Sequence, residues 1–148
     1  MSRLQLALNV SNLEESVEFY SKFFKTEPAK IRPGYANFAI AEPPLKLVLF
    51  ENREVPGTIN HLGVEVYSTT EVVEATRHLA AEGFDTDVED GTICCHALQD
   101  KVWVDGPDGS RWEVYTVLAD ASETADMAGG EICCTTATST TSEATACC

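Results

Sequence analysis

One strand-like pattern occurs twice in this chain, and this internal repeat constrains the fold more than any other feature. Residues 4–10 (LQLALNV) align with residues 60–66 (NHLGVEV), and apolar side chains recur at every second position in both segments. An alternation of this period predicts two strands that each bury one face. The alignment places Gln5 opposite His61, so two polar residues share one position of the repeat.

Each predicted strand is followed by the same type of helix start. Residues 11–14 (SNLE) and 68–71 (STTE) both have a serine followed three positions later by a glutamate. In such a capping box the hydroxyl group accepts a hydrogen bond from a backbone amide, and the glutamate reaches back to the start of the helix. We therefore expect helices capped by Ser11 and Ser68.

Three short strand candidates follow each predicted helix. In the first half they lie near Ile31 and over residues 36–41 and 45–50, and in the second half over residues 84–88, 91–95 and 101–115. The last of these contains a turn at residues 105–109 (DGPDG), in which proline restricts φ and glycine can adopt positive φ. The sequence thus predicts an α+β fold of two βαβββ modules, about residues 1–55 and 56–118.

The remaining residues, 119–148, have a different composition. They contain five acidic residues, no lysine or arginine, and many Ser, Thr, Ala and Gly residues. We expect them to form an acidic tail without a packed core, outside a domain of residues 1–118.

Charge and hydropathy exclude some functions. The chain has 24 acidic and 10 basic residues, a net charge of −14, which disfavours binding to nucleic acid. No stretch approaches the roughly 20 apolar residues that a transmembrane helix needs, and the N-terminus does not resemble a signal peptide. We expect a cytoplasmic protein that acts without a membrane.

The six cysteines occur only as adjacent pairs, at positions 94–95, 133–134 and 147–148. A disulfide between neighbouring residues closes a strained ring, so free vicinal thiols are the better interpretation. Such a dithiol suits a soft, thiophilic centre, although two small apolar residues in a strand would give the same pattern.

The chain resembles the vicinal oxygen chelate superfamily, which is also known as the glyoxalase/bleomycin-resistance/extradiol-dioxygenase superfamily. Residues 105–113 (DGPDGSRWE) are similar to its D-P-D-G-x-x-x-E hairpin. The first predicted strand is followed by a stretch that also resembles the family and ends at Phe19-Tyr20. The resemblance covers residues 1–118. It implies that the two modules form a half-open cup around a divalent metal, with Gln5, His61 and Glu113 as the metal ligands.

The residue types can be weighed separately from this resemblance. A lone Gln, His or Glu in a strand usually lies at the surface or at the edge of the core. Glu113, however, lies in the middle of a strand, where a carboxylate is costly to bury without a compensating positive charge. Val48 aligns with Glu113, so the fourth protein ligand that glyoxalase-type members of the superfamily use is missing. Three ligands with open positions resemble non-haem Fe(II) oxygenase sites, and we expect Fe(II) with dioxygen as co-substrate, while other divalent metals remain open.

Cys94 and Cys95 indicate which members of the superfamily the chain resembles most. A vicinal dithiol near an oxygen-activating metal is similar to the carbon-arsenic bond lyases of the superfamily, which are related to its cadmium-inducible proteins. This implies an enzyme that converts trivalent organoarsenicals, such as methylarsenite and trivalent aromatic arsenicals, to arsenite. His96 stands where relatives often have tyrosine; it could alter substrate preference, add a ligand or simply face solvent.

Adjacent side chains of a regular strand point to opposite faces. Cys94 and Cys95 can therefore bind one arsenic atom only if the backbone departs from strand geometry, and we expect a mobile loop over residues 91–101. Two other functions remain open: a glyoxalase-type metalloenzyme, and a non-catalytic protein that traps cadmium, arsenite or a drug on its thiols. We expect a monomer or a homodimer.

Overall fold

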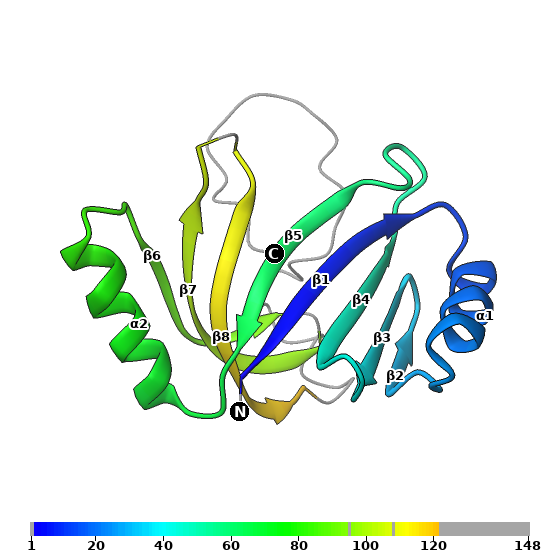
Figure 1. Cartoon of the computed structure of the whole chain (residues 1–148), viewed down its shortest axis with the longest axis horizontal. Coiled ribbons are helices and arrows are strands. Elements are labelled where there is room, and N and C mark those ends of the chain that lie inside the picture. Colours follow the sequence, from blue (N-terminus) through cyan, green and yellow to red (C-terminus); the bar gives the residue numbers. More distant parts are fainter. Residues whose placement is uncertain (1, 95, 108, 122–148) are drawn as a thin grey trace.

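The structure is a computed structural model, and it describes residues 2–94, 96–107 and 109–121. These residues form two helices and eight strands (Figure 1). The order along the chain is β1 (Arg3–Val10), α1 (Leu13–Phe24), β2 (Lys30–Arg32), β3 (Tyr35–Ile40), β4 (Leu45–Glu51), β5 (Ile59–Glu65), α2 (Thr69–Ala81), β6 (Asp87–Cys94), β7 (Ala97–Asp105) and β8 (Arg111–Asp120).

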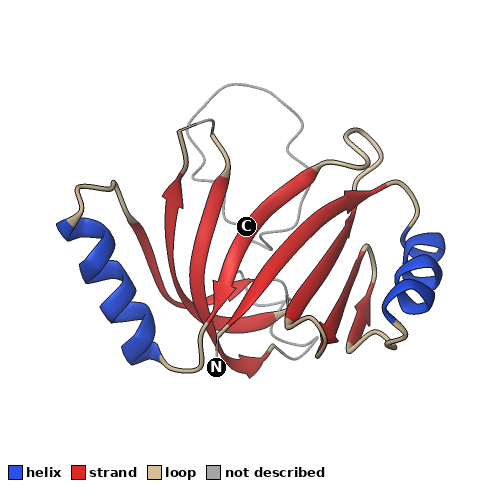
Figure 2. Ribbon diagram, viewed as in Figure 1, coloured by secondary structure: helices blue, strands red, loops and turns tan. Residues whose placement is uncertain are grey.

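All described strands belong to one sheet in the order β2-β3-β4-β1-β5-β8-β7-β6. Within each module the first strand pairs in parallel with the last, as β1 does with β4 and β5 with β8. The modules meet through the antiparallel pair β1–β5. The sheet is curled, and a helix flanks it on either side (Figure 2). The predicted α+β fold of two paired βαβββ modules is confirmed.

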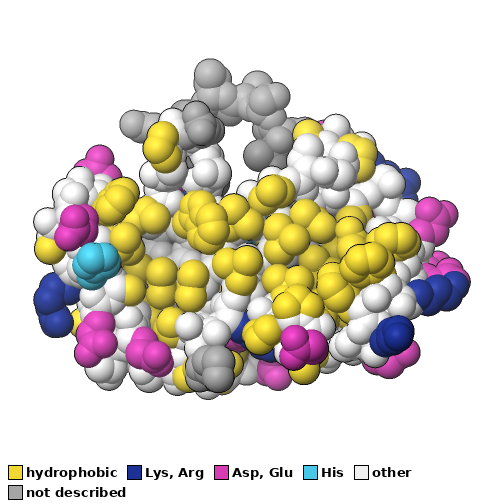
Figure 3. Space-filling model, in the orientation of Figure 1, with side chains coloured by type: hydrophobic (Ala, Val, Ile, Leu, Met, Phe, Trp, Pro, Cys, Tyr) yellow, Lys and Arg dark blue, Asp and Glu magenta, His cyan; other side chains and the backbone are white. Residues whose placement is uncertain are grey.

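Strand alternation separates an inner from an outer face of this sheet. In β1 the side chains of Gln5, Ala7 and Asn9 are buried in the concave interior. Leu6 and Leu8 lie on the outer face and pack with α1 against the core of the first module. Figure 3 shows hydrophobic side chains gathered over the central strands between the two helices.

The two helix starts differ from the prediction in one respect. Ser68 caps α2 as expected: its hydroxyl accepts a hydrogen bond from the Glu71 amide at 3.3 Å, and the Glu71 carboxylate accepts one from the Tyr67 amide at 3.0 Å. The expectation that Ser11 caps α1 was wrong, because the Asn12 side chain accepts from the Glu15 amide at 3.1 Å. Asparagine is as good an N-cap as serine, so either residue could have started the helix.

Replacement of Ser68 by alanine tests the capping contact. Ser68→Ala leaves a backbone amide of α2 without its side-chain acceptor and should lower the free energy of unfolding by about 1 kcal/mol. Ser11→Ala is the matched control and should change stability little, since Ser11 caps no helix here. Urea denaturation of both variants measures the difference, and equal losses would contradict the assignment.

The expected loop over residues 91–101 was wrong. β6 continues to Cys94 and β7 begins at Ala97, with Cys94 and Ala97 paired, so only two residues connect the strands. The separate strand candidates at 84–88 and 91–95 are replaced by one strand, which is interrupted by a register shift before Thr92 near Gly91, whose φ is +60°. The sequence pattern of a bulge followed by a tight turn was therefore mistaken for that of a loop. His96 adopts φ of +64° in this connection.

The last strand ends close to the last described residue, Ala121. β8 continues to Asp120, two residues into the expected tail, and the rest of that tail lies outside the described residues together with Cys133, Cys134, Cys147 and Cys148. The domain boundaries stay predictions. Within the described residues, neither helix has the length and apolar character needed to cross a bilayer.

Candidate functional site

Three neighbouring strands bring the predicted metal ligands together. β5 lies between β1 and β8, and its Gly63 pairs with Gln5 on one side and with Glu113 on the other. His61 lies two positions before Gly63 and therefore points to the same inner face. The side chains of Gln5, His61 and Glu113 are all buried.

The polar atoms of these residues converge on one point. The Gln5 Nε2 atom lies 2.6 Å from Glu113 Oε1 and 3.0 Å from His61 Nε2, and His61 Nε2 lies 3.3 Å from Glu113 Oε1. Residues from positions 5, 61 and 113 of the chain thus form one compact cluster. The structure brings the three predicted side chains together, and their role as ligands remains a proposal.

The surroundings of His61 orient its ring. The Nδ1 atom lies 2.8 Å from Asn60 Oδ1, and the Asn60 amide nitrogen donates to Asn9 Oδ1 at 3.0 Å. Because Asn60 Oδ1 can only accept, Nδ1 donates in this contact, and Nε2 is the ring nitrogen that faces the cluster. Such a contact is typical of the residues that orient a metal-bound histidine.

Glu113 is held in its ionised form. Burial raises the pKa of this carboxyl group, but the neighbouring His61 and the ammonium group of Lys101 lower it more, so the pKa lies below the usual value. Lys101 is 1% exposed, and its Nζ atom lies 3.1 Å from Glu113 Oε2 as an ion pair without hydrogen-bond geometry. The negative charge that a metal ion requires is therefore present at neutral pH.

Tyr115 holds the side chain of Gln5 in place. Burial and the nearby carboxylates of Glu65 and Glu113 raise the pKa of its phenol well above the usual value, so the hydroxyl stays protonated and donates to Gln5 Oε1. The Gln5 amide nitrogen faces the cluster in this arrangement. Binding of a cation through Oε1 requires rotation of the amide group, after which Tyr115 can accept from Nε2, because a hydroxyl group serves in both roles.

The residue types fit a three-ligand metal site. Within residues 2–94, 96–107 and 109–121 no group of three or more His, Cys, Asp or Glu side chains could hold a metal, so the amide of Gln5 is needed to complete one. Val48 pairs with Ala7 in β1–β4 as Glu113 pairs with Gly63 in β5–β8. The predicted equivalence of Val48 and Glu113 is confirmed, and the fourth position is apolar.

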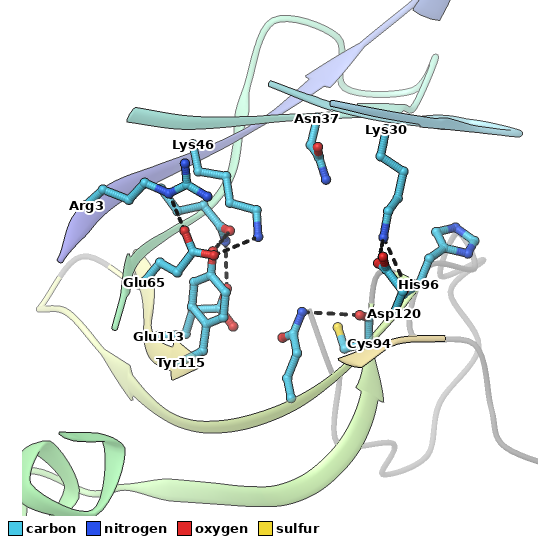
Figure 4. A network of polar contacts seen from close by, with 12 residues as sticks. Arg3, Lys30, Asn37, Lys46, Glu65, Cys94, His96, Glu113, Tyr115 and Asp120 are labelled. Atoms are coloured by element: carbon cyan, nitrogen blue, oxygen red, sulfur yellow. Dashed lines mark hydrogen bonds and ion pairs between the residues drawn. The ribbon is translucent and has the colours of Figure 1, made fainter. Parts of the chain in front are cut away.

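A cavity of about 200 Å³ opens beside the cluster. Its wall includes Gln5, His61 and Glu113 together with the apolar side chains of Val48 and Phe50. Charged side chains that line it form pairs, which are Arg3 and Lys46 with Glu65, and Lys30 with Asp120. Figure 4 shows these pairs as two groups on opposite sides of an open centre.

The end of β6, which carries the thiol of Cys94, lies next to this cavity. Cys94 is 1% exposed, and its partner across the turn, Ala97, lines the cavity. The His96 ring lies 5.4 Å from the ring of Tyr35, another lining residue, so it packs against the cavity wall. Cys95 lies outside the described residues. In Figure 4 Cys94, His96 and Asp120 form a group separate from Glu113 and Tyr115.

Several polar residues of the site were not found from the sequence. Gln99, Lys101 and Trp103 alternate along β7, and all three are buried. The period of two in residues 97–105 is the signal that could have indicated a shared inner face. It was obscured because the expected loop covered the same residues. Tyr115 follows Glu113 at the same period in β8 and carries the same signal.

Gly63 provides a structural test of the cluster. A Cβ atom at this position would lie 2.9 Å from Glu113 Cγ and 3.5 Å from Gln5 Cβ. Gly63→Ala should therefore lower the free energy of unfolding by roughly 1–3 kcal/mol and move Glu113 away from Gln5. Thermal denaturation and divalent-metal titration measure the two effects. A variant that matches the wild type in both would show that the strands are not packed this closely.

The sequence of this chain is similar to those of known proteins. Residues 3–114 match the profile of the Glyoxalase/Bleomycin resistance protein/Dioxygenase superfamily. The cadmium-induced protein CadI of Mycobacterium tuberculosis is 63% identical over 121 residues, covering 82% of this chain and 80% of CadI. The trivalent organoarsenical cleaving enzyme of Thermomonospora curvata is 57% identical over 136 residues, covering 91% of this chain and 89% of that protein.

A solved structure has the same fold at low sequence identity. Homoprotocatechuate 2,3-dioxygenase from Arthrobacter globiformis superimposes with a TM-score of 0.58 at 18% identity, covering 84% of this chain and 39% of the dioxygenase. The fold, the profile match over most of the described residues and the two close relatives agree. The chain belongs to the Glyoxalase/Bleomycin resistance protein/Dioxygenase superfamily.

Proposed function

We propose that this protein is an enzyme that cleaves the carbon-arsenic bond of trivalent organoarsenicals, including methylarsenite and trivalent aromatic arsenicals, and releases arsenite. The observation that carries the proposal is the 57% identity to a trivalent organoarsenical cleaving enzyme over 89% of that protein. The buried cluster of Gln5, His61 and Glu113 beside a cavity supports it.

Gln5, His61 and Glu113 would hold Fe(II) through an amide oxygen, an imidazole nitrogen and a carboxylate oxygen. When bound, Fe(II) would supply the redox chemistry for dioxygen, the co-substrate. The apolar Val48 leaves room at the position where a fourth protein ligand would be. Lys101 ion-pairs with the other carboxylate oxygen of Glu113, so the site keeps a positive charge that favours anionic species.

Cys94 and Cys95 would bind the arsenic atom as a dithiolate. Trivalent arsenic is soft and prefers thiolate ligands, and two sulfur atoms leave its organic substituent free. β6 ends at Cys94, so the two cysteines do not have to share a regular strand. The pairing of Cys94 with Ala97, which lines the cavity, supports this role.

A second candidate function is a protein that binds cadmium or arsenite on its thiols without turnover. It rests on the adjacent cysteines of the sequence, and a relative at 63% identity is named a cadmium-induced protein. Both candidates need the cysteines, but only the enzyme needs the Gln5–His61–Glu113 cluster. Turnover therefore separates them.

Aerobic arsenite release tests the proposal. Protein loaded with Fe(II) under anaerobic conditions is mixed with methylarsenite, and arsenite production and oxygen uptake are followed after admission of air. We expect both signals together and neither under nitrogen. Stoichiometric arsenical binding without product would instead support sequestration, and metal-dependent turnover without oxygen uptake would support a glyoxalase-type reaction.

A cytoplasmic location and a monomeric or homodimeric state remain predictions from the sequence. Size-exclusion chromatography with light scattering would measure the second. The prediction that neither nucleic acid nor membrane takes part also follows from the charge and hydropathy of the sequence.

A further inference from the structure

Gln99 belongs to the cavity wall and carries a buried hydrogen-bond acceptor, the side-chain oxygen Oε1. The side chain lies on β7, is 4% exposed and lines the cavity wall. Its Nε2 atom donates to the backbone oxygen of Cys94 at 3.3 Å. Because that oxygen can only accept, the contact fixes which end of the amide group is the oxygen. Among the described residues, Gln99 Oε1 has no hydrogen-bond partner.

The other polar groups around the cavity have partners. Lys30 pairs with Asp120, Lys46 pairs with Glu65, and the Asn37 amide donates to the Tyr35 hydroxyl at 2.8 Å. Glu113 Oε2 also lacks a hydrogen bond, but the Lys101 ammonium group lies 3.1 Å away. A buried acceptor without a donor is unfavourable, because it has lost its hydrogen bonds to water and gained none in the protein. Gln99 Oε1 is therefore the atom in the described wall that most requires a donor from a bound molecule.

The position of Gln99 indicates which part of a ligand would supply that donor. Gln99 lies two residues after Ala97 on the same face of β7, and Ala97 pairs with Cys94. A ligand bound through the Cys94 sulfur thus starts beside this amide. An arsenic atom that has exchanged both of its hydroxyl groups for thiolates carries no O–H donor. The donor must then belong to the organic substituent.

From this geometry we infer that Gln99 is a specificity-determining residue that accepts a hydrogen bond from an amino or hydroxyl group on the organic substituent of the arsenical. The inference rests on the proposed function and deepens it. Substrates with a ring donor are favoured over substrates of the same shape without one, because only the former satisfy the buried oxygen. The hydrogen bond to the Cys94 carbonyl holds the Gln99 amide in the orientation that leaves Oε1 to accept from this donor.

Two aromatic arsenicals of similar shape test the inference. The kcat/KM values for trivalent 4-aminophenylarsenite and 4-methylphenylarsenite are compared in the wild type and in Gln99→Met, which keeps the side-chain length without an acceptor. We expect the ratio of the amino to the methyl substrate to fall about tenfold in the variant, equivalent to about 1.4 kcal/mol. Gln99→Leu should give the same direction. A ratio measured within one variant is unaffected by a general loss of active protein.

The matched control is Val117→Ala. Val117 pairs with Gln99 across β7–β8 and lines the same cavity, but it has no hydrogen-bonding side chain. Its substitution should leave the substrate ratio unchanged. An unchanged ratio in both Gln99 variants, or an equal change in Val117→Ala, would overturn the inference.

A binding measurement keeps this test separate from the test of catalysis. The Trp103 ring lies 5.4 Å from the His61 ring, so its fluorescence can report occupation of the cavity in protein without metal. If no arsenical is cleaved, the proposed function fails, and the ratio of the two dissociation constants in wild type and Gln99→Met still decides the role of Gln99. If both arsenicals are cleaved with equal loss in the variant, only the inference fails.

Discussion

Glu113→Gln is expected to reduce affinity for a divalent metal by more than about 100-fold. Removal of groups that merely orient a ligand already costs about 10–100-fold, and Glu113 would supply the only anionic ligand of the proposed set. The substitution retains the size of the side chain. Anaerobic titration with Fe(II), or with Co(II) as a coloured surrogate, measures the dissociation constant directly, without reference to catalysis.

Glu65→Gln is the matched control for this variant. Glu65 is also buried and lines the same cavity, but it pairs with Arg3 and Lys46 and not with the predicted ligands. Its substitution should leave metal affinity nearly unchanged. Because Glu113→Gln removes the partner of the buried Lys101 ammonium, circular dichroism of both variants should accompany the titration. Wild-type affinity in folded Glu113→Gln would exclude Glu113 as a ligand.

Cys94→Ser is expected to weaken binding of trivalent organoarsenicals by roughly 100-fold or more. Loss of one thiolate converts a two-point attachment into a single one, and the advantage of the second attachment is typically at least of this size. Serine is nearly isosteric with cysteine, so the buried position should tolerate it. Isothermal titration of metal-free protein with methylarsenite measures the change.

The tail cysteines provide the control for this second experiment. A Cys133→Ser, Cys134→Ser double variant removes one vicinal dithiol from outside the predicted domain and should keep the high-affinity arsenical site. If the double variant loses that site and Cys94→Ser retains it, the tail is the binding element. Glu113→Gln should still bind arsenical and Cys94→Ser should still bind metal, which would separate the two halves of the proposed site.

Much of the candidate site could be predicted because it follows from local patterns. The repeat of residues 4–10 and 60–66 put Gln5 and His61 at one position, and the alignment of the last strands indicated that Val48 replaces a fourth ligand. Paired strands keep such equivalent positions in register, as the matching pairs Ala7–Val48 and Gly63–Glu113 confirm. The two helix starts were found to within one residue, since Ser11 and Asn12 are both good caps.

The amino-acid sequence by itself determined the βαβββ repeat, the inward face of β1 and β5, and the residue types of the Gln5–His61–Glu113 cluster, because strand periodicity and capping are encoded by near neighbours. Only the tertiary structure decided the partners of these side chains. Lys101 balances the negative charge of Glu113, and the Tyr115 hydroxyl donates a hydrogen bond to Gln5. The Gln99 amide donates to the backbone oxygen of Cys94. These contacts cross between strands that are distant in the chain or lie across the tight turn after Cys94. Periodicity assigns a side chain to a face of its strand, but its partners are set by which strands become neighbours when the sheet curls.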